Sequence, residues 1–115
     1  MTVMKVIHLV IAVVTVGFGL LSVLAPKAAL RFTGLAAPAG RGISEVRAVL
    51  GGVFVGLGIA ALLYQTKAAF GTAGIVYLAI ALVRIVSIYL DDASTGSNWG
   101  SLAFEVVCGI LLLIH

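Results

Sequence analysis

The stretch "SEVRAVLGGVFVGLGIAALLY", residues 44–64, decides the fold of this chain. A carboxylate, Glu45, and a guanidinium, Arg47, lie near its start, and no charged residue follows up to residue 64. A helical run of about 17 to 25 apolar residues is long enough to cross a hydrocarbon core roughly 30 Å thick. The stretch therefore predicts a membrane-spanning helix that carries two charges in its first turn.

The rest of the chain has the same character. Its 115 residues are 63% hydrophobic and 10% charged, with a mean hydropathy of +1.29, so the polar residues are too few to coat a soluble globule of this size. The predicted spanning helices cover residues 6–24, 44–64, 68–90 and 99–114. We expect a single all-α, integral membrane domain over residues 1–115.

The connections between these helices predict an up-down-up-down bundle of four helices. Residues 65–67, "QTK", form a tight turn, residues 91–98, "DDASTGSN", form a polar turn, and residues 25–43 form a longer connection. Short connections favour antiparallel neighbours, so both termini share one side of the membrane. Asn98 or Ser97 is expected to cap the last helix.

The first connection is basic. Its segment "PKAALRF", residues 26–32, is expected to form a short helix in the membrane interface. Lys27, Arg31 and Arg41 favour placing the first and third connections in the cytoplasm of a bacterium, with both termini outside the cytoplasmic membrane.

Four charged residues fall inside the predicted spans, and such residues are costly in lipid unless they have partners. By helical rise, Glu45, Arg47, Arg84 and Glu105 all lie in one layer beneath the first and third connections. Residues two apart on a helix point roughly 200° apart, so Glu45 and Arg47 do not pair with each other. We expect Glu105 to pair with Arg84 or Arg47, and Glu45 with the remaining arginine.

Further polar residues share the helix faces of Arg84 and Glu105, which predicts a polar pocket closed by apolar side chains. The candidate residues for ligand binding or a charge network are Glu45, Arg47, Arg84, Ser87, Asp91, Ser101 and Glu105. Two other interpretations stay open: the network holds the helices in register, or Glu45 and Arg47 reach the headgroups from the interface.

Glycines at close spacing predict tight helix packing. The segment "GVFVG", residues 52–56, has the spacing that lets two backbones approach in lipid. Gly51, Gly52 and Gly56 are the predicted packing residues, either inside the bundle or between two copies of the chain.

Three segments carry a resemblance to a known family: "SEVRAVLGGVFVGLG", "LVRIVSIYLDD" and "FEVVCGILL". Together they resemble the bacterial family of small four-helix membrane proteins called domain of unknown function 4345, and more loosely the DoxX-like membrane proteins. The resemblance implies the same fold, and it implies no reaction. Residue Ala93 departs from the glycine that the family favours after the acidic turn. The residues that match the family's polar signature are Glu45, Arg47, Gly51, Gly52, Arg84, Asp91 and Glu105.

Several site classes are not expected. The single cysteine, Cys108, offers no metal-ligand spacing, and His8 and His115 are expected at the interface rather than as haem ligands. No phosphate-binding glycine loop and no nucleophile beside a base can be recognised. We therefore expect neither cofactor nor metal, and no nucleic-acid partner.

The sequence favours a non-enzymatic binding or accessory protein, in which the charge layer receives a polar headgroup, a small lipophilic ligand or a partner helix. One alternative is a small proton-coupled transporter that acts as an oligomer. Another is a membrane enzyme that uses Glu105 as acid or base on a lipophilic substrate. The expected partners are membrane lipid and either a second copy or another membrane protein.

Overall fold

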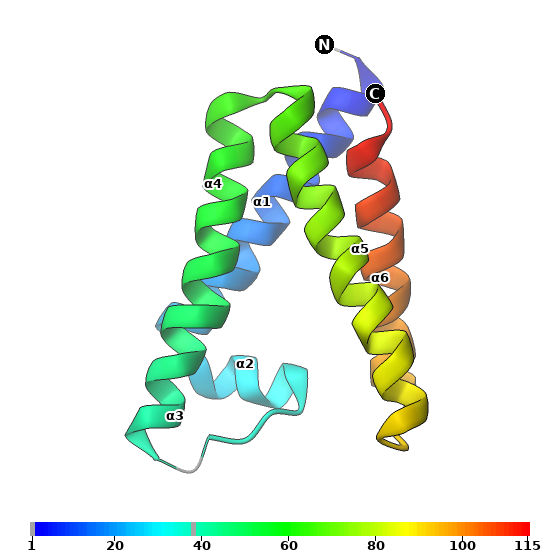
Figure 1. The fold of residues 1–115 in the computed structure, drawn as a ribbon. Coiled ribbons are helices and arrows are strands. Elements are labelled where there is room, and N and C mark those ends of the chain that lie inside the picture. Colours follow the sequence, from blue (N-terminus) through cyan, green and yellow to red (C-terminus); the bar gives the residue numbers. More distant parts are fainter. Residues whose placement is uncertain (1, 38) are drawn as a thin grey trace. The chain divides into compact units, whose positions relative to one another are not determined.

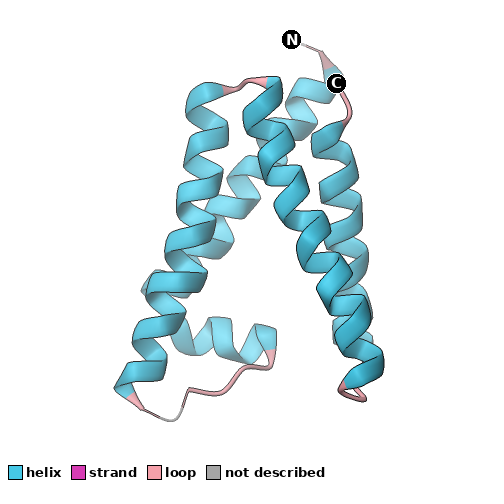
Figure 2. Ribbon diagram, in the orientation of Figure 1, coloured by secondary structure: helices cyan, strands magenta, loops and turns pink. Residues whose placement is uncertain are grey.

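A computed structural model describes residues 2–37 and 39–115, and this part of the chain is helical apart from short connections, with no strand (Figure 2). The elements are α1 (Val3–Leu24), α2 (Pro26–Thr33), α3 (Gly40–Glu45), the π-helical segment η1 (Val46–Gly51), α4 (Gly52–Tyr64), α5 (Lys67–Leu90) and α6 (Gly96–Leu113). Four helical stretches are long and apolar enough to cross a membrane: Val3–Leu24, Gly40–Tyr64, Lys67–Leu90 and Gly96–Leu113. The predicted all-α class with four such helices is confirmed.

The chain divides into two compact units. The first unit comprises residues 2–8 and 65–115, and within it α5 and α6 run antiparallel, side by side (Figure 1). The second unit comprises residues 9–64, and within it α4 runs antiparallel to α1. The association of these elements into one up-down bundle stays a prediction.

Helices α5 and α6 meet along a seam whose residues recur at intervals of three and four. Along α5 the buried seam residues are Phe70, Gly74, Tyr77, Ala81 and Ile88, and along α6 they are Leu102, Glu105, Gly109 and Leu112. This spacing keeps one stripe of each helix facing its partner. A Cβ on Gly74 would lie 2.9 Å from the carbonyl oxygen of Gly109, so the two backbones nearly touch there.

Helices α1 and α4 approach each other through glycine. A Cβ on Gly58 would lie 2.9 Å from the carbonyl oxygen of Ala12 and 3.0 Å from the backbone nitrogen of Val16. Gly51, one seven-residue period earlier, faces Val23 in the same way. Side chains at these positions would separate the helices.

Two of the three predicted packing glycines, Gly52 and Gly56, do not contact α1, unlike Gly51. A Cβ on either would meet no atom within 4 Å. The close approach therefore uses Gly51 with Gly58, which share a helix face, and the 52–56 spacing lies on another face. A role for Gly52 and Gly56 against a further helix stays a prediction.

All four spanning helices begin earlier than predicted, at Val3, Gly40, Lys67 and Gly96. Helix α6 begins at Gly96 because the Thr95 side chain caps it, accepting a hydrogen bond of 3.2 Å from the backbone nitrogen of Asn98. The predicted caps, Ser97 and Asn98, were wrong. The second spanning helix begins at Gly40 instead of residue 44; a glycine lowers helix propensity by only about 1 kcal/mol, so Gly40 and Gly42 do not prevent helix formation.

The short helix expected in the first connection is present as α2. Pro26 occupies its first turn, where the missing backbone N–H costs no hydrogen bond. Gly34 ends it in the left-handed conformation, with φ of 77°, and donates to the carbonyl of Leu30.

Candidate functional site

A charged pair lies in the seam between α5 and α6. Nε of Arg84 donates to Oε1 of Glu105 at 2.7 Å, and a terminal nitrogen of the same guanidinium donates to Oε2 at 2.7 Å. Such a two-pronged arrangement is the strongest hydrogen-bonding geometry available to these side chains. Of the two arginines expected for Glu105, the structure places Arg84 against it.

Asn98 extends this pair to the turn that joins the helices. The remaining terminal nitrogen of Arg84 donates to Oδ1 of Asn98 at 2.8 Å. The Asn98 amide nitrogen in turn donates to the carbonyl oxygen of Ala93 at 2.9 Å. The guanidinium is therefore held at three of its five N–H groups by a network that reaches the α5–α6 turn.

The helix turns next to Arg84 and Glu105 carry buried apolar residues. Ala81, Ile88 and Leu102 form a buried cluster, and Val106 packs against it. The Arg84 side chain is 29% exposed and the Glu105 side chain 10%. The accessible part of the pair is consequently the cation, while the carboxylate is enclosed.

The other predicted residues of α5 and α6 lie near the network without joining it. The Ser87 hydroxyl donates to Oδ2 of Asp91 at 2.5 Å, one turn further along α5. Ser101 is half-buried one turn before Glu105, but Arg84 bonds to Asn98 and Glu105 instead.

Glu45 and Arg47 belong to the second unit, where each has its own partner. Glu45 forms an ion pair with Arg41, and Arg47 donates to the carbonyl oxygen of Val23. The two side chains thus bond to different neighbours, as the helical geometry predicts. The expected pairing of Glu45 with Arg47 or Arg84 was wrong, because the helix begins at Gly40 and places Arg41 one turn before Glu45 on the same face.

Residues 3–115 match the model of a family described as a domain of unknown function, DUF4345. The chain belongs to the DUF4345 family. No curated protein and no solved structure matches this chain. The family resemblance seen in the three sequence segments is confirmed, whereas the looser resemblance to DoxX-like proteins stays a prediction.

The chemistry available to this DUF4345 protein follows from its donor set. Among residues 2–37 and 39–115 no three His, Cys, Asp or Glu side chains gather into a group that could hold a metal ion. Cys108 is buried and free. The α5–α6 site is therefore best suited to donate hydrogen bonds from the Arg84 guanidinium.

Two partners in these networks were missed from the sequence. Asn98 was placed on the same helix face as Glu105 and was also considered as a helix cap, but it was not predicted as a partner of Arg84. Arg41 was assigned to the loop, although it lies four residues before Glu45. Both spacings are visible in the sequence, but each becomes informative only once the helix start is placed correctly.

Proposed function

We propose that this DUF4345 protein is a non-enzymatic binding or accessory protein of the membrane. In this proposal the Arg84 site receives a polar group that accepts hydrogen bonds: a lipid headgroup, a polar group on a small lipophilic ligand, or a polar residue of a partner helix. The observation that supports it is the buried Arg84–Glu105 pair, whose accessible side is the guanidinium.

The hydrogen bonding of Arg84 favours this class of ligand. Three of its N–H groups are used inside the first unit, and two remain for an incoming acceptor. A guanidinium prefers planar or tetrahedral oxyanions, because its fork of donors matches carboxylate and phosphate groups. Glu105 and Asn98 hold the fork in place, so little side-chain entropy is lost on binding.

The same geometry weighs against the two alternatives. Transport coupled to protons, and acid–base catalysis, both need a carboxylate that exchanges a proton. Both oxygens of Glu105 accept from Arg84, so proton uptake would break one of these hydrogen bonds. The arrangement therefore supports recognition better than proton transfer.

The proposal extends to surroundings and partners. We place the protein in the bacterial cytoplasmic membrane, with the first and third connections in the cytoplasm, because Lys27, Arg31 and Arg41 lie in or beside the first connection. Gly52 and Gly56 leave a smooth face on α4, which suits a second copy or another membrane protein.

Native mass spectrometry of protein extracted from its own membranes tests this function. The informative variant replaces Arg84 with Met and Glu105 with Leu together, because removing both charges leaves no unpaired ion in the seam. The matched control replaces Arg41 with Met and Glu45 with Leu, which removes an exposed pair of the same composition.

The wild type and the Arg41/Glu45 variant should retain a bound lipid, small molecule or protein that the Arg84/Glu105 variant loses. Circular dichroism establishes that each variant is folded. If the folded Arg84/Glu105 variant keeps the same bound species as the wild type, the α5–α6 pair has a structural role only and the proposed function is wrong.

A further inference from the structure

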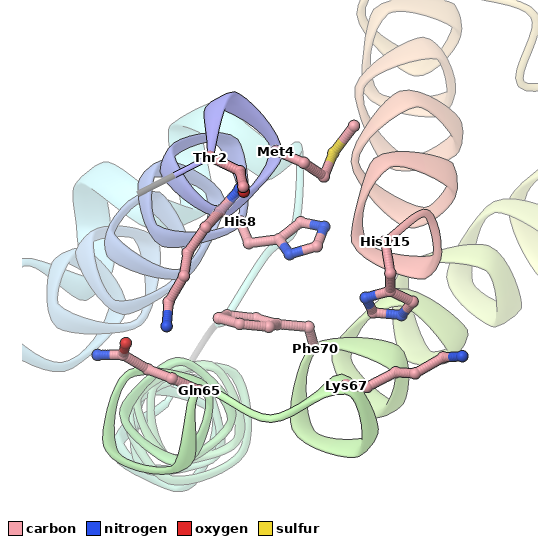
Figure 3. Close-up of a pocket in the computed structure, with 8 residues that line it drawn as sticks. Thr2, Met4, His8, Gln65, Lys67, Phe70 and His115 are labelled. Atoms are coloured by element: carbon pink, nitrogen blue, oxygen red, sulfur yellow. The ribbon is translucent and has the colours of Figure 1, made fainter.

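A hollow of about 180 Å³ lies within the first unit, at the end where α1 and α5 begin. Figure 3 shows the rings of His8, Phe70 and His115 gathered around it, with Lys67 extending beside His115. The volume is below the roughly 300 to 1,000 Å³ of pockets that enclose drug-sized ligands, so the hollow suits a small chemical group. Its lining residues are Thr2, Met4, Lys5, His8, Gln65, Lys67, Phe70 and His115.

The charge of this hollow is one-sided. Lys5, Lys67, His8 and His115 line it, and no carboxylate side chain does. The acids of the first unit lie elsewhere: Glu105 pairs with Arg84, and Asp91 and Asp92 lie in the turn at the far end of α5. The two ammonium groups, with no carboxylate side chain in the lining, favour an anion in this hollow.

His8 is held in a fixed position at this hollow. It is only 4% exposed, and its Nε2 lies 2.7 Å from the carbonyl oxygen of Leu111. Because a carbonyl oxygen only accepts hydrogen bonds, Nε2 must carry the hydrogen. The ring centroids of Phe70 and His115 lie 4.7 and 5.5 Å from that of His8, so its ring is fixed by contacts on several sides.

Two helix starts contribute positive potential here, and the C-terminal carbonyls of α6, which include Leu111, offset part of it. Helices α1 and α5 both begin at this end, and first-turn N–H groups of long helices favour negative charge nearby. At α5 the Thr66 hydroxyl accepts from the backbone nitrogen of Ala69. The backbone N–H groups of Lys67 and Ala68 lie in the same first turn, where N–H groups have no acceptor within the helix itself.

We propose that this hollow, defined by Lys5, His8, Lys67 and His115, binds a phosphate-bearing anion. The site is distinct from the Arg84–Glu105 seam and does not depend on the function proposed for it. The anion is the phosphodiester headgroup of an anionic lipid or a free phosphate, since both present tetrahedral oxygens to ammonium and imidazolium donors.

Binding of an anion here is linked to protonation. Desolvation, followed by the positive charges of Lys67 and His8, lowers the pKa of His115. A bound anion offsets that repulsion, so it raises the pKa of His115. By reciprocity, protonated His115 binds the anion more tightly, and affinity for an anion of constant charge rises as the pH falls through this pKa.

The test is a histidine NMR titration of the full chain in lipid nanodiscs, with the His115 signal assigned from a His115→Asn variant. Phosphatidylcholine discs without phosphate give the reference. One arm adds inorganic phosphate to these discs, and the other mixes in phosphatidylglycerol, whose phosphodiester keeps one negative charge through the titration. We expect the pKa of His115 to rise by about 0.5, equivalent to roughly threefold tighter anion binding to the protonated ring.

Two double variants distinguish anion binding at this site from non-specific attraction of anions to the positively charged protein. The Lys5→Gln/Lys67→Gln variant should lose most of the rise, whereas Lys27→Gln/Arg31→Gln, which removes two exposed cations from α2, should keep it. A rise in the phosphate arm supports a site for free phosphate, and a rise only with phosphatidylglycerol supports a lipid headgroup. No rise in either arm, or an undiminished rise in the Lys5/Lys67 variant, would overturn the proposal.

Discussion

The two antiparallel helix pairs of this protein both use glycine contacts, but only one of them adds a buried ion pair. Helices α1 and α4 approach through glycines, and the contact is largely backbone against backbone or β-branched side chain. Helices α5 and α6 also have one glycine contact, at Gly74 and Gly109, but two charged side chains occupy seam positions further along. In lipid, apolar side chains do not by themselves select a partner, so close packing and polar contacts determine specificity. The α1–α4 contact relies mainly on close packing, whereas the α5–α6 contact combines close packing with a buried ion pair.

The largest effect is expected from removing one member of the α5–α6 ion pair. Glu105→Ala leaves the Arg84 guanidinium without its carboxylate inside an apolar seam. Breaking a buried pair in this way typically costs about 3 to 5 kcal/mol. Unfolding in mixed micelles, followed by circular dichroism against denaturant, should show a loss of this size.

The double variant, Arg84→Met with Glu105→Leu, sharpens this prediction. Replacing both charges by apolar side chains is often neutral or stabilising. We therefore expect its stability to stay close to that of the wild type, whereas Arg41→Met/Glu45→Leu should change stability by less than about 1 kcal/mol because that pair is exposed. If Glu105→Ala is no less stable than the wild type, the pair does not hold α5 to α6.

A smaller loss is expected from filling the glycine contact of α1 with α4. Gly58→Val places a branched side chain where even a Cβ would lie 2.9 Å from the carbonyl oxygen of Ala12. Overpacking of this kind costs roughly 1 to 3 kcal/mol, and the backbone on the other side cannot rotate away.

Gly56→Val is the matched control for that contact. It adds the same side chain to the same helix, at a position where a Cβ meets nothing within 4 Å. Steric-trap or denaturant unfolding should separate the two variants. Equal losses would mean that the cost comes from helix propensity and not from contact with α1.

Sequence reasoning predicted the four spanning helices and named Arg84 as one of two possible partners of Glu105, because both follow from helical rise, chain length and the cost of charge in lipid. It named Gly51 but not Gly58 as a packing glycine, since the motif at 52–56 and the contact at 51 and 58 look alike without knowledge of which face meets α1. The partner of Glu45 was misplaced for a related reason: helix starts are weakly encoded, and a shift from residue 44 to Gly40 brings Arg41 onto the helix.

The hollow at the start of α1 and α5 shows a different limit. His8, His115, Lys5 and Lys67 could be assigned to one end of the molecule from the predicted topology. Their convergence depends on side-chain direction and on the carbonyl of Leu111, which accepts from His8 at the end of α6. A hydrogen bond between residues 103 positions apart leaves no local pattern in the sequence.

The smallest effect concerns the helix starts, which also differ between the units. In the first unit, Thr66 and Thr95 cap α5 and α6 with their hydroxyl groups. In the second unit, α3 follows Ala39, which provides no side-chain cap.

Thr95→Ala should lower the unfolding free energy by about 1 kcal/mol. Ala39→Ser should raise it by a few tenths to about 1 kcal/mol, because the serine hydroxyl can accept from a first-turn N–H. Amide hydrogen exchange at Asn98 and at Gly42 measures both changes locally. Faster exchange in the first variant and slower exchange in the second are expected; no change at Asn98 would mean that Asn98 itself, bonded to Ala93 and Arg84, holds the first turn of α6 in place without Thr95.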